Sequence, residues 1–294
     1  MGVEPAGGPP RLLSVLSGKA LRQVPTATGR VIGQTCDMAT SKLPLWRPAG
    51  KLLLLVGATL ALLTAGCTVW RLGEARSLAR ASEPYQQQPQ QAALRMLIVG
   101  DSTGVGTGAS HPGASLAGLL GAAYPRLALE NRARDGARFE AVPAQIAAAS
   151  AQGGYDIILI SAGGNDVIRG TDTAVLARWL DDSFVSAKAR LAPGGQVVIQ
   201  PPGMVGHAPF FLPPISSLMN SRATEMHAAV RAAAARHGVR VVNMARAKDA
   251  DPFVQRPEMN ADDGLHPSDA GYRVWRDELL AQTDLAERLA PAAR

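Results

Sequence analysis

A serine stands where a buried strand is expected to end and a helix to begin. Residues 100–104 read GDSTG and directly follow a short apolar run. A hydroxyl on such a turn is presented at the edge of a sheet where ligands gather, which suits Ser102 to act as a nucleophile. The same turn is compatible with a plain helix N-cap, because serine is a preferred capping residue. Ser102 is therefore a candidate nucleophile with a structural alternative.

Two other glycine patterns overlap this turn. GDSTG matches the GxSxG nucleophile elbow of α/β-hydrolases, but it follows the first strand of the domain, and no HGGG-like stretch precedes it. Gly104–Gly108, followed by Ala109, partly matches the GxGxxG turn that binds dinucleotide phosphates, with Glu130 as the acid for a ribose. A dinucleotide site leaves the polar residues after the later strands unexplained, so we disfavour it.

Two further polar clusters come later in the chain. GGND at 163–166 follows an apolar run, and DGLH at 263–266 precedes the last helical stretch. Each cluster by itself is an ordinary turn or a loop with solvated charges. Together with Ser102 they supply a hydroxyl, an amide, carboxylates and an imidazole, and coincidence is a poor explanation for that combination in this order.

Strand-like and helix-like segments alternate through residues 93–290. Aliphatic runs bounded by Gly, Pro or Asp predict strands buried on both faces at 96–99, 126–131, 155–161, 196–200 and 239–243. Helical periodicity predicts helices at 114–123, 143–151, 173–191, 216–237 and 268–289. This alternation predicts a three-layer α/β/α sandwich with a central parallel five-stranded sheet. The carboxyl ends of its strands would bring the polar clusters to one edge.

With these motifs in this order, residues 96–280 resemble the SGNH (GDSL) hydrolase family, whose fold is flavodoxin-like. The family's blocks match GDS at 100–102, residues 131–136, GND at 164–166 and DGLH at 263–266. The resemblance implies a serine esterase with a catalytic triad. Ser102 would be the nucleophile, His266 would take its proton and return it to the leaving group, and Asp263 would orient the imidazole.

The resemblance also implies an oxyanion hole. Its donors would be the backbone amides of Ser102 and Gly136 and the side chain of Asn165. A glycine at 136 lets the backbone approach the substrate without a Cβ in the way. The second block departs from the family pattern, since Ala133 stands where glycine is frequent and residues 132, 134 and 135 are charged. Thr103 replaces the leucine of the GDSL name.

The net charge of +6 belongs to the N-terminal part of the chain. Residues 1–91 carry 10 Lys and Arg against 4 Asp and Glu, and residues 92–294 carry 20 of each. The part able to fold as a domain is therefore neutral and lacks the basic footprint of a nucleic-acid binder. We expect no nucleic-acid partner.

An apolar segment follows the basic leader at 1–51. Leu52–Trp70 has 19 residues without an ionisable side chain, which predicts a transmembrane anchor or a cleaved signal. Residues 64–67 (TAGC) resemble a lipobox, which would make the chain a lipoprotein at Cys67. Every alternative places the later residues outside the cytoplasm, in the periplasm or beyond the cell. Met38 starts a compact leader of its own, and we expect translation to begin there, with 1–37 mis-assigned.

Three further expectations concern the rest of the chain. Residues 71–92 are rich in Gln and Pro toward their end and predict a solvated, flexible tether before a domain at 93–290. Cys36 and Cys67 are the only cysteines and precede this domain, so we expect neither a disulfide nor thiolate chemistry in it. No metal or organic cofactor is implied. We expect His207 to lie at the surface, because no second ligand residue has metal spacing.

Residues 203–214 (GMVGHAPFFLPP) are the main clue to a substrate. Their apolar side chains either line an acyl pocket or lid, or pack on the core. Three functions stay open: a membrane-tethered serine esterase acting on small-molecule, lipid, thioester or acetylated-glycan esters, an O-acyltransferase acting on envelope glycans, and a binding module that has lost catalysis.

Overall fold

The computed structural model describes residues 46–150 and 153–290. The chain divides into two compact units, Met1–Leu52 and Leu53–Arg294, and the second contains the whole sheet. The alternative start at Met38 and most of the basic leader lie outside the described residues.

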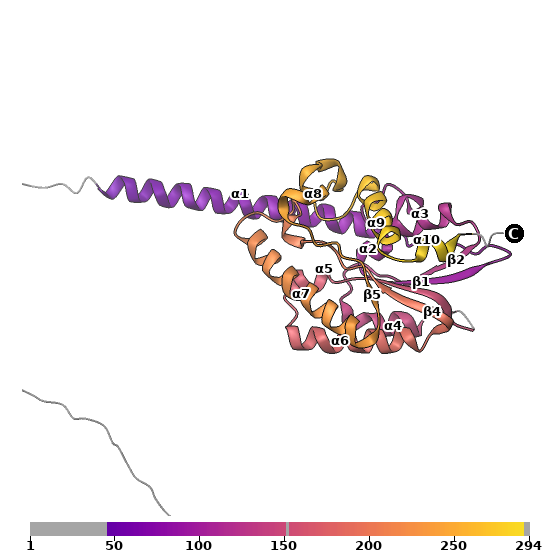
Figure 1. Cartoon of the computed structure of the whole chain (residues 1–294). Helices are drawn as coiled ribbons and strands as arrows, with labels where there is room; N and C mark the ends of the chain where they lie inside the picture. Colours follow the sequence, from indigo (N-terminus) through magenta and orange to yellow (C-terminus); the bar gives the residue numbers. More distant parts are fainter. Residues whose placement is uncertain (1–45, 151–152, 291–294) are drawn as a thin grey trace, which may run out of the picture. The chain divides into compact units, whose positions relative to one another are not determined.

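A parallel five-stranded sheet forms the centre of the second unit (Figure 1). Its strands lie in the order β2-β1-β3-β4-β5, and every neighbouring pair is parallel. They are β1 (Leu94–Gly100), β2 (Leu127–Asn131), β3 (Tyr155–Ser161), β4 (Leu191–Ile199) and β5 (Arg240–Val241). The predicted strand count and direction are confirmed, and the carboxyl ends of β1, β3 and β4 share one edge.

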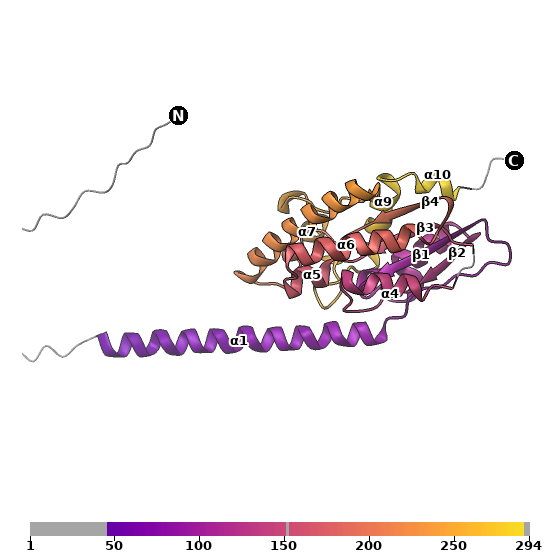
Figure 2. The same ribbon diagram turned by 90° about the horizontal axis from the view of Figure 1, so that it is seen from below.

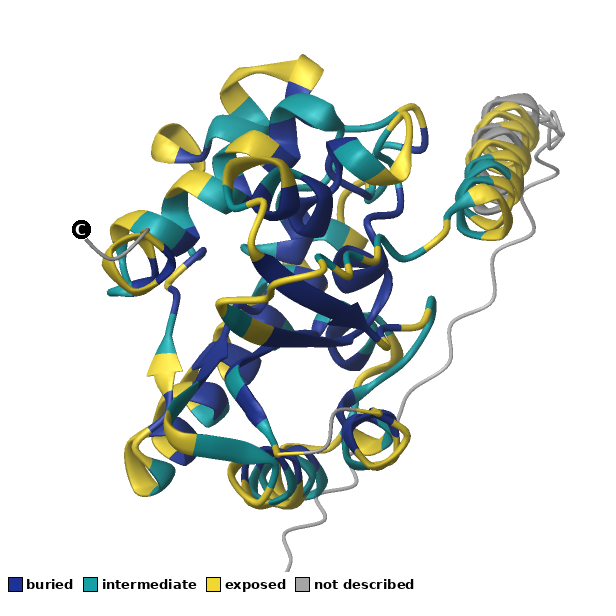
Figure 3. Ribbon diagram, turned by 90° about the vertical axis from the view of Figure 1, so that its right-hand side faces the viewer, coloured by how far each residue is buried: buried dark blue, intermediate teal, exposed yellow. Residues whose placement is uncertain are grey.

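Helices cover both faces of this sheet, so the predicted three-layer sandwich is confirmed: α3 and α9 lie above the strands and α4 and α6 below them in Figure 1, and Figure 2 looks onto the layer of α6 and α7. One face packs against α4, α5, α6 and α7, and the other against α3, α9 and α10. Neighbouring residues of β1 alternate between the two cores: Leu97 and Val99 enter one, Met96 and Ile98 the other. Both faces of the sheet are covered, so the central strands are buried, as the dark blue in Figure 3 shows. Strands buried on both faces are continuous apolar runs in sequence. The helices are α1 (Trp46–Ala81), α2 (Ser102–Val105), α3 (Leu116–Ala123), α4 (Val142–Ala147), α5 (Gly164–Arg169), α6 (Thr173–Lys188), α7 (Ile215–His237), α8 (Pro252–Gln255), α9 (Asp269–Ala281) and α10 (Leu285–Leu289).

Several element boundaries differ from the sequence prediction, most clearly around β4 and in the last helix. Helix α6 ends at Lys188, and β4 begins at Leu191, where the periodicity predicted helix. Tyr155 pairs with Leu191 and Ile157 with Gln196, so the Pro-Gly-Gly segment at 193–195 bulges out of β4. Glycine and proline there interrupt a strand rather than precede one. The last predicted helix is divided into α9 and α10.

A single long helix carries the apolar segment. Helix α1 spans the apolar run and continues to Ala81. No helix within residues 46–150 and 153–290 is both long and apolar enough to cross a membrane, so the anchor predicted at 52–70 finds no support.

The predicted tether at 71–92 is wrong in its last part. The backbone of Gln87 exchanges two hydrogen bonds with Leu129 of β2, at 3.0 and 2.8 Å. The side chain of Gln86 bonds both the N–H and the carbonyl of Asn131. A polar tract therefore covers the exposed edge of β2, where unpaired backbone groups need partners.

Candidate active site

The turn after β1 is built around Gly100, which has a left-handed φ of +135°. A Cβ at this position would lie 1.8 Å from the carbonyl oxygen of Ser161 on β3, so only glycine fits. Asp101 then caps α2 by accepting bonds from the Thr103 N–H at 2.9 Å and the Thr103 hydroxyl at 2.7 Å. The cap is Asp101 and not Ser102, so the capping alternative for the serine is wrong, and its hydroxyl is left for other contacts.

A chain of hydrogen bonds joins the three residues of the predicted triad. The Nε2 atom of His266 lies 2.9 Å from Oγ of Ser102, and its Nδ1 atom lies 2.5 Å from Oδ2 of Asp263. All three residues are buried. The structure brings together a hydroxyl, an imidazole and a carboxylate in the linear order that activates a serine.

Asp263 is held ionised by its own turn. Burial by itself would raise the pKa of this carboxyl, but hydrogen bonds from His266 and Leu265 outweigh burial, and the pKa is lowered from 3.8. Its Oδ1 atom accepts the backbone N–H groups of Leu265 at 2.8 Å and His266 at 3.0 Å. Gly264, with φ of +67°, makes this tight turn. A fixed negative charge thus faces the imidazole.

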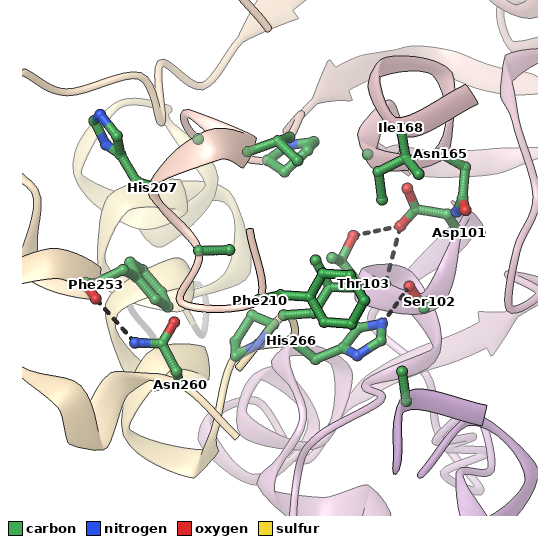
Figure 4. Close-up of a pocket in the computed structure, with 18 of the residues that line it drawn as sticks. Asp101, Ser102, Thr103, Asn165, Ile168, His207, Phe210, Phe253, Asn260 and His266 are labelled. Atoms are coloured by element: carbon green, nitrogen blue, oxygen red, sulfur yellow. Dashed lines mark hydrogen bonds between the residues drawn. The ribbon is translucent and has the colours of Figure 1, made fainter. Parts of the chain in front are cut away.

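The predicted oxyanion donors lie around one cavity of about 480 Å³ that opens beside Ser102 (Figure 4). Ser102, Gly136, Asn165 and His266 all line it. Gly136 has φ of +73°, so a left-handed backbone is a further reason for glycine here. Much of the remaining wall is apolar, formed in part by Ile168, Met204, Val205, Phe210, Phe253 and Leu265.

The sequence of the domain matches a known family. The model of the GDSL-like lipase/acylhydrolase family matches residues 98–274, which is more than half of the chain. The chain belongs to this family. It is an ester hydrolase of the GDSL-like type, and the expected family and enzyme class are confirmed. No curated protein matches the sequence.

Solved structures share the fold of this GDSL-like hydrolase. A G-D-S-L family lipolytic protein from Veillonella parvula is 19% identical with a TM-score of 0.52, over 64% of this chain and 97% of its own. The extracellular lipase of Streptomyces rimosus is 22% identical with a TM-score of 0.51, over 65% and 100%. Phospholipase A1 of Streptomyces albidoflavus is 19% identical with a TM-score of 0.53, over 65% and 100%.

Two further buried carboxylates, Asp101 and Asp166, position this site. The sequence motifs did not assign a role to either. Asp101 hydrogen-bonds the backbone of Gly164 as well as Thr103, which ties the serine turn to the start of α5 beside Asn165. Burial raises the pKa of Asp101 despite these bonds. Asp101 lies in the GDS motif and Asp166 in the GND motif, so these motifs were the sequence signal that could have identified both residues.

Asp166 connects α5 to the loop that carries Gly136. Its Oδ2 atom accepts the N–H of Phe139 at 3.2 Å, and its Oδ1 atom accepts the hydroxyl of Thr171 at 3.0 Å. Burial raises its pKa from 3.8 to about 6. Asp166 thereby holds the two non-serine oxyanion candidates, Gly136 and Asn165, on connected elements.

The departures in the second block have structural reasons. Ala133 is buried against Gly104, where a Cβ on the glycine would come within 2.8 Å of the alanine methyl. The carboxylate of Asp135 accepts the hydroxyl of Thr107 at 2.6 Å. Glu130, the acid of the dinucleotide alternative, is instead bonded to Tyr155, Arg132 and Ser150. It is occupied inside the fold, which argues against a ribose-binding role.

The loop at 203–214 combines both roles considered for it. Phe210 lines the cavity, Phe211 packs on the core, and Met204 does both. The expected surface position of His207 is wrong: its side chain is only 8% exposed and bonds Asp251 at 2.8 Å. Within the described parts of the chain, no group of three or more His, Cys, Asp or Glu residues is arranged to hold a metal.

Proposed function

We propose that this chain hydrolyses carboxylic esters through a Ser102–His266–Asp263 triad and an acyl-enzyme. The observation that carries the proposal is the unbroken hydrogen-bond chain from Asp263 through His266 to Ser102, which ends at an open cavity. Ser102 Oγ attacks the ester carbonyl and His266 Nε2 takes its proton. The ionised Asp263 stabilises the imidazolium that forms.

The tetrahedral intermediate places negative charge on the former carbonyl oxygen. We assign its stabilisation to the amides of Ser102 and Gly136 and the side chain of Asn165, which face one cavity. As the carbon–oxygen bond breaks, His266 returns the proton to the alcohol, which leaves. Water then attacks the acyl-enzyme with His266 again as base, releasing the acid and restoring the serine hydroxyl.

The apolar wall of the cavity favours an acyl group of some length. Ile168, Met204 and Phe210 can cover a hydrocarbon chain, and a cavity of about 480 Å³ has room for a small lipid or thioester acyl group. Acetylated glycans, small in the acyl part, stay a candidate substrate. An O-acyltransferase would use the same residues and differ only in whether water or a sugar hydroxyl reaches the acyl-enzyme.

The test is hydrolysis of p-nitrophenyl esters from acetate to octanoate by the protein and by Ser102→Ala. We expect the variant to lose at least about 10⁴-fold in kcat/KM while keeping its circular dichroism spectrum and its melting temperature. A fluorophosphonate should add mass to Ser102 in the protein and not in the variant. Retained activity in the variant would refute the nucleophile, and labelling without turnover would favour the transferase.

We also propose that the domain works outside the cytoplasm. The apolar run at 52–70 behind a basic leader supports export. Cell fractionation followed by intact-mass measurement of the enzyme would test it. A new N-terminus beyond residue 66 without added lipid would mean a cleaved signal, and one at Cys67 with a diacylglycerol would mean a lipoprotein. An intact N-terminus would mean that the segment is retained. Enzyme found in the cytoplasm would overturn the proposal.

A further inference from the structure

Exposed large apolar side chains gather on one segment beside the active site. Outside α1, four such side chains occur among the described residues, and three of them fall between residues 212 and 218. Leu212 and Ile215 are each 48% exposed and Leu218 is 46% exposed, whereas the fourth, Val185, lies on α6. We call Leu212, Ile215 and Leu218 the apolar rim. Contiguous exposed apolar residues mark contact surfaces more often than single ones do.

Two of the three side chains, Ile215 and Leu218, lie in the first turn of α7, and Leu212 comes just before that helix. They are spaced three residues apart, and helical hydrogen bonds begin early in the segment: Ser216 N–H donates to Leu212 and Leu218 N–H to Pro214. Residues at this spacing lie on one face of a helix. Ile215 and Leu218 thus share one face at the start of α7, and Leu212 directly precedes it; α7 begins near the end of the sheet that carries α2 and α5 (Figure 1).

The rim lies close to the cavity along the chain. Phe210, two residues before Leu212, lines the cavity and stacks edge to face on Phe211, with ring centroids 4.9 Å apart. The backbone N–H of Phe210 donates to the carbonyl of Gly264 at 2.9 Å. Gly264 lies inside the turn between Asp263 and His266. A molecule docked on the rim is therefore next to both the cavity mouth and the catalytic turn.

Charge on this segment favours an anionic lipid over a basic partner. Residues 201–224 contain no Asp or Glu, and His207 and Arg222 are their only ionisable side chains. The exposed Arg169 also borders the cavity, where its guanidinium donates to the carbonyl of Gly136 at 3.1 Å, and in the described part of the chain no carboxylate forms an ion pair with it. Arg222 borders a separate small pocket together with Asp172 and Glu225, so carboxylates lie near its charge. Apolar side chains beside a cation are typical of surfaces that bind anionic lipid.

We propose that the apolar rim docks this enzyme on an anionic lipid surface, with the cavity mouth facing the headgroups. An ester-bearing lipid then passes from that surface to Ser102 without crossing water. The delivery of lipid esters rests on the proposed esterase function. The docking step does not, and it can be measured in a protein that has no catalytic activity.

The direct test places an environment-sensitive dye on the rim of the full chain. Ile215→Cys, with Cys36 and Cys67 changed to Ser, is labelled with nitrobenzoxadiazole and mixed with vesicles of equal parts phosphatidylcholine and phosphatidylglycerol. Val185→Cys is the matched control, because Val185 is also exposed but lies away from the rim. Lys188, one turn further along α6, bonds the carbonyl of His237 at the opposite end of α7 from the rim. We expect a blue shift and an emission gain of about twofold or more at 215 and none at 185.

Three outcomes would overturn the docking surface. The first is no change in the emission of the dye at 215 while the protein sediments with the vesicles. The second is an equal change in emission at 215 and 185. The third is a change in emission at 215 that needs no vesicles and grows with protein concentration. The last outcome would mean that a second copy of the chain covers the rim. Because the readout is spectroscopic, it also holds in a Ser102→Ala background, so failure of docking and failure of catalysis are distinguished.

A kinetic test addresses delivery. The triple variant Leu212→Ser, Ile215→Ser, Leu218→Ser should hydrolyse dissolved p-nitrophenyl acetate at the normal rate and lose about fivefold or more on p-nitrophenyl laurate embedded in the same vesicles. Val185→Ser should change neither rate. Equal losses on both substrates, or no loss on the embedded ester, would contradict delivery from the lipid surface.

Discussion

At the scale of single residues, the site depends on two kinds of carboxylate. Asp263 is kept ionised by N–H donors and faces His266, whereas Asp101 and Asp166 are buried with raised pKa values and connect backbone segments. The first kind acts on the charge of the imidazole, and the second kind holds the surrounding elements in place.

The roles within the triad predict a ranking of variants. His266→Ala removes the base and should lower kcat by about 10⁶-fold, close to the effect of removing the serine. Asp263→Asn keeps the size of the side chain but favours the wrong imidazole tautomer, so we expect a loss of about 10⁴-fold. Steady-state kinetics on p-nitrophenyl acetate would check this, and a larger loss for Asp263→Asn would contradict the assigned roles.

Asp166 should make stability depend on pH. Burial raises its pKa from 3.8 to about 6, so between these values the folded protein holds a proton that the unfolded chain has released. The contribution of this group to the free energy of unfolding therefore falls as pH rises from about 4 to about 6. Asp166→Asn has no group that titrates at this position. The free energy of unfolding of the native protein, minus that of the variant, should therefore fall by up to about 3 kcal/mol across this window. Urea unfolding of both proteins at several pH values would measure it, and a constant difference would contradict the raised pKa.

At the scale of elements, the serine turn depends on close contact between β1 and β3. Gly100 pairs with Ser161, and its α-carbon leaves no room for a side chain. The turn therefore follows from strand pairing as much as from its own residues.

This contact predicts a severe effect of Gly100→Ala. A Cβ 1.8 Å from the Ser161 carbonyl oxygen must push β1 and β3 apart, which should cost about 4 kcal/mol or more. Gly194→Ala is the control: it has φ of +77° with nothing within 4 Å of the added Cβ, so only backbone strain of about 1 kcal/mol applies. Thermal unfolding compares the two, and equal costs would rule out the steric explanation.

At the scale of the whole molecule, the folded unit begins before residue 93. Tyr85 packs against the core between the sheet and α3, and Gln86 and Gln87 bond the backbone of β2. The edge strand β2 and the core beside it therefore depend on residues 85–87, which lie in the segment whose composition predicts a linker.

Two truncations test this boundary. A chain of residues 83–294 should keep activity and melting temperature close to those of the full protein. A chain of residues 93–294 loses the five bonds that Gln86 and Gln87 make with β2 and should be less stable by about 5 kcal/mol, at about 1 kcal/mol for each bond. Equal urea midpoints for the two chains would show that the edge cover is not needed.

Several properties of this protein were determined by sequence alone because they are local. Continuous apolar runs gave the strands, periodicity gave most helices, and strand order along the chain implied a parallel sheet. The three-residue spacing of Asp263 and His266 already placed acid and base on one turn. The motifs named the residues of the triad and the candidates for the oxyanion hole, because their types and order carry the chemistry.

Only the tertiary structure decided what depends on contacts between distant residues. Ser102 and His266 are 164 residues apart in sequence, and packing of the sheet and its helices brings them to 2.9 Å. The burial of His207, the cover that Gln87 forms on β2 and the bulge in β4 had no local signal, because polar residues and a Pro-Gly-Gly segment are equally compatible with solvent. Their positions follow from which backbone groups and cavities of the folded chain needed partners, and that is settled only when the whole core is assembled.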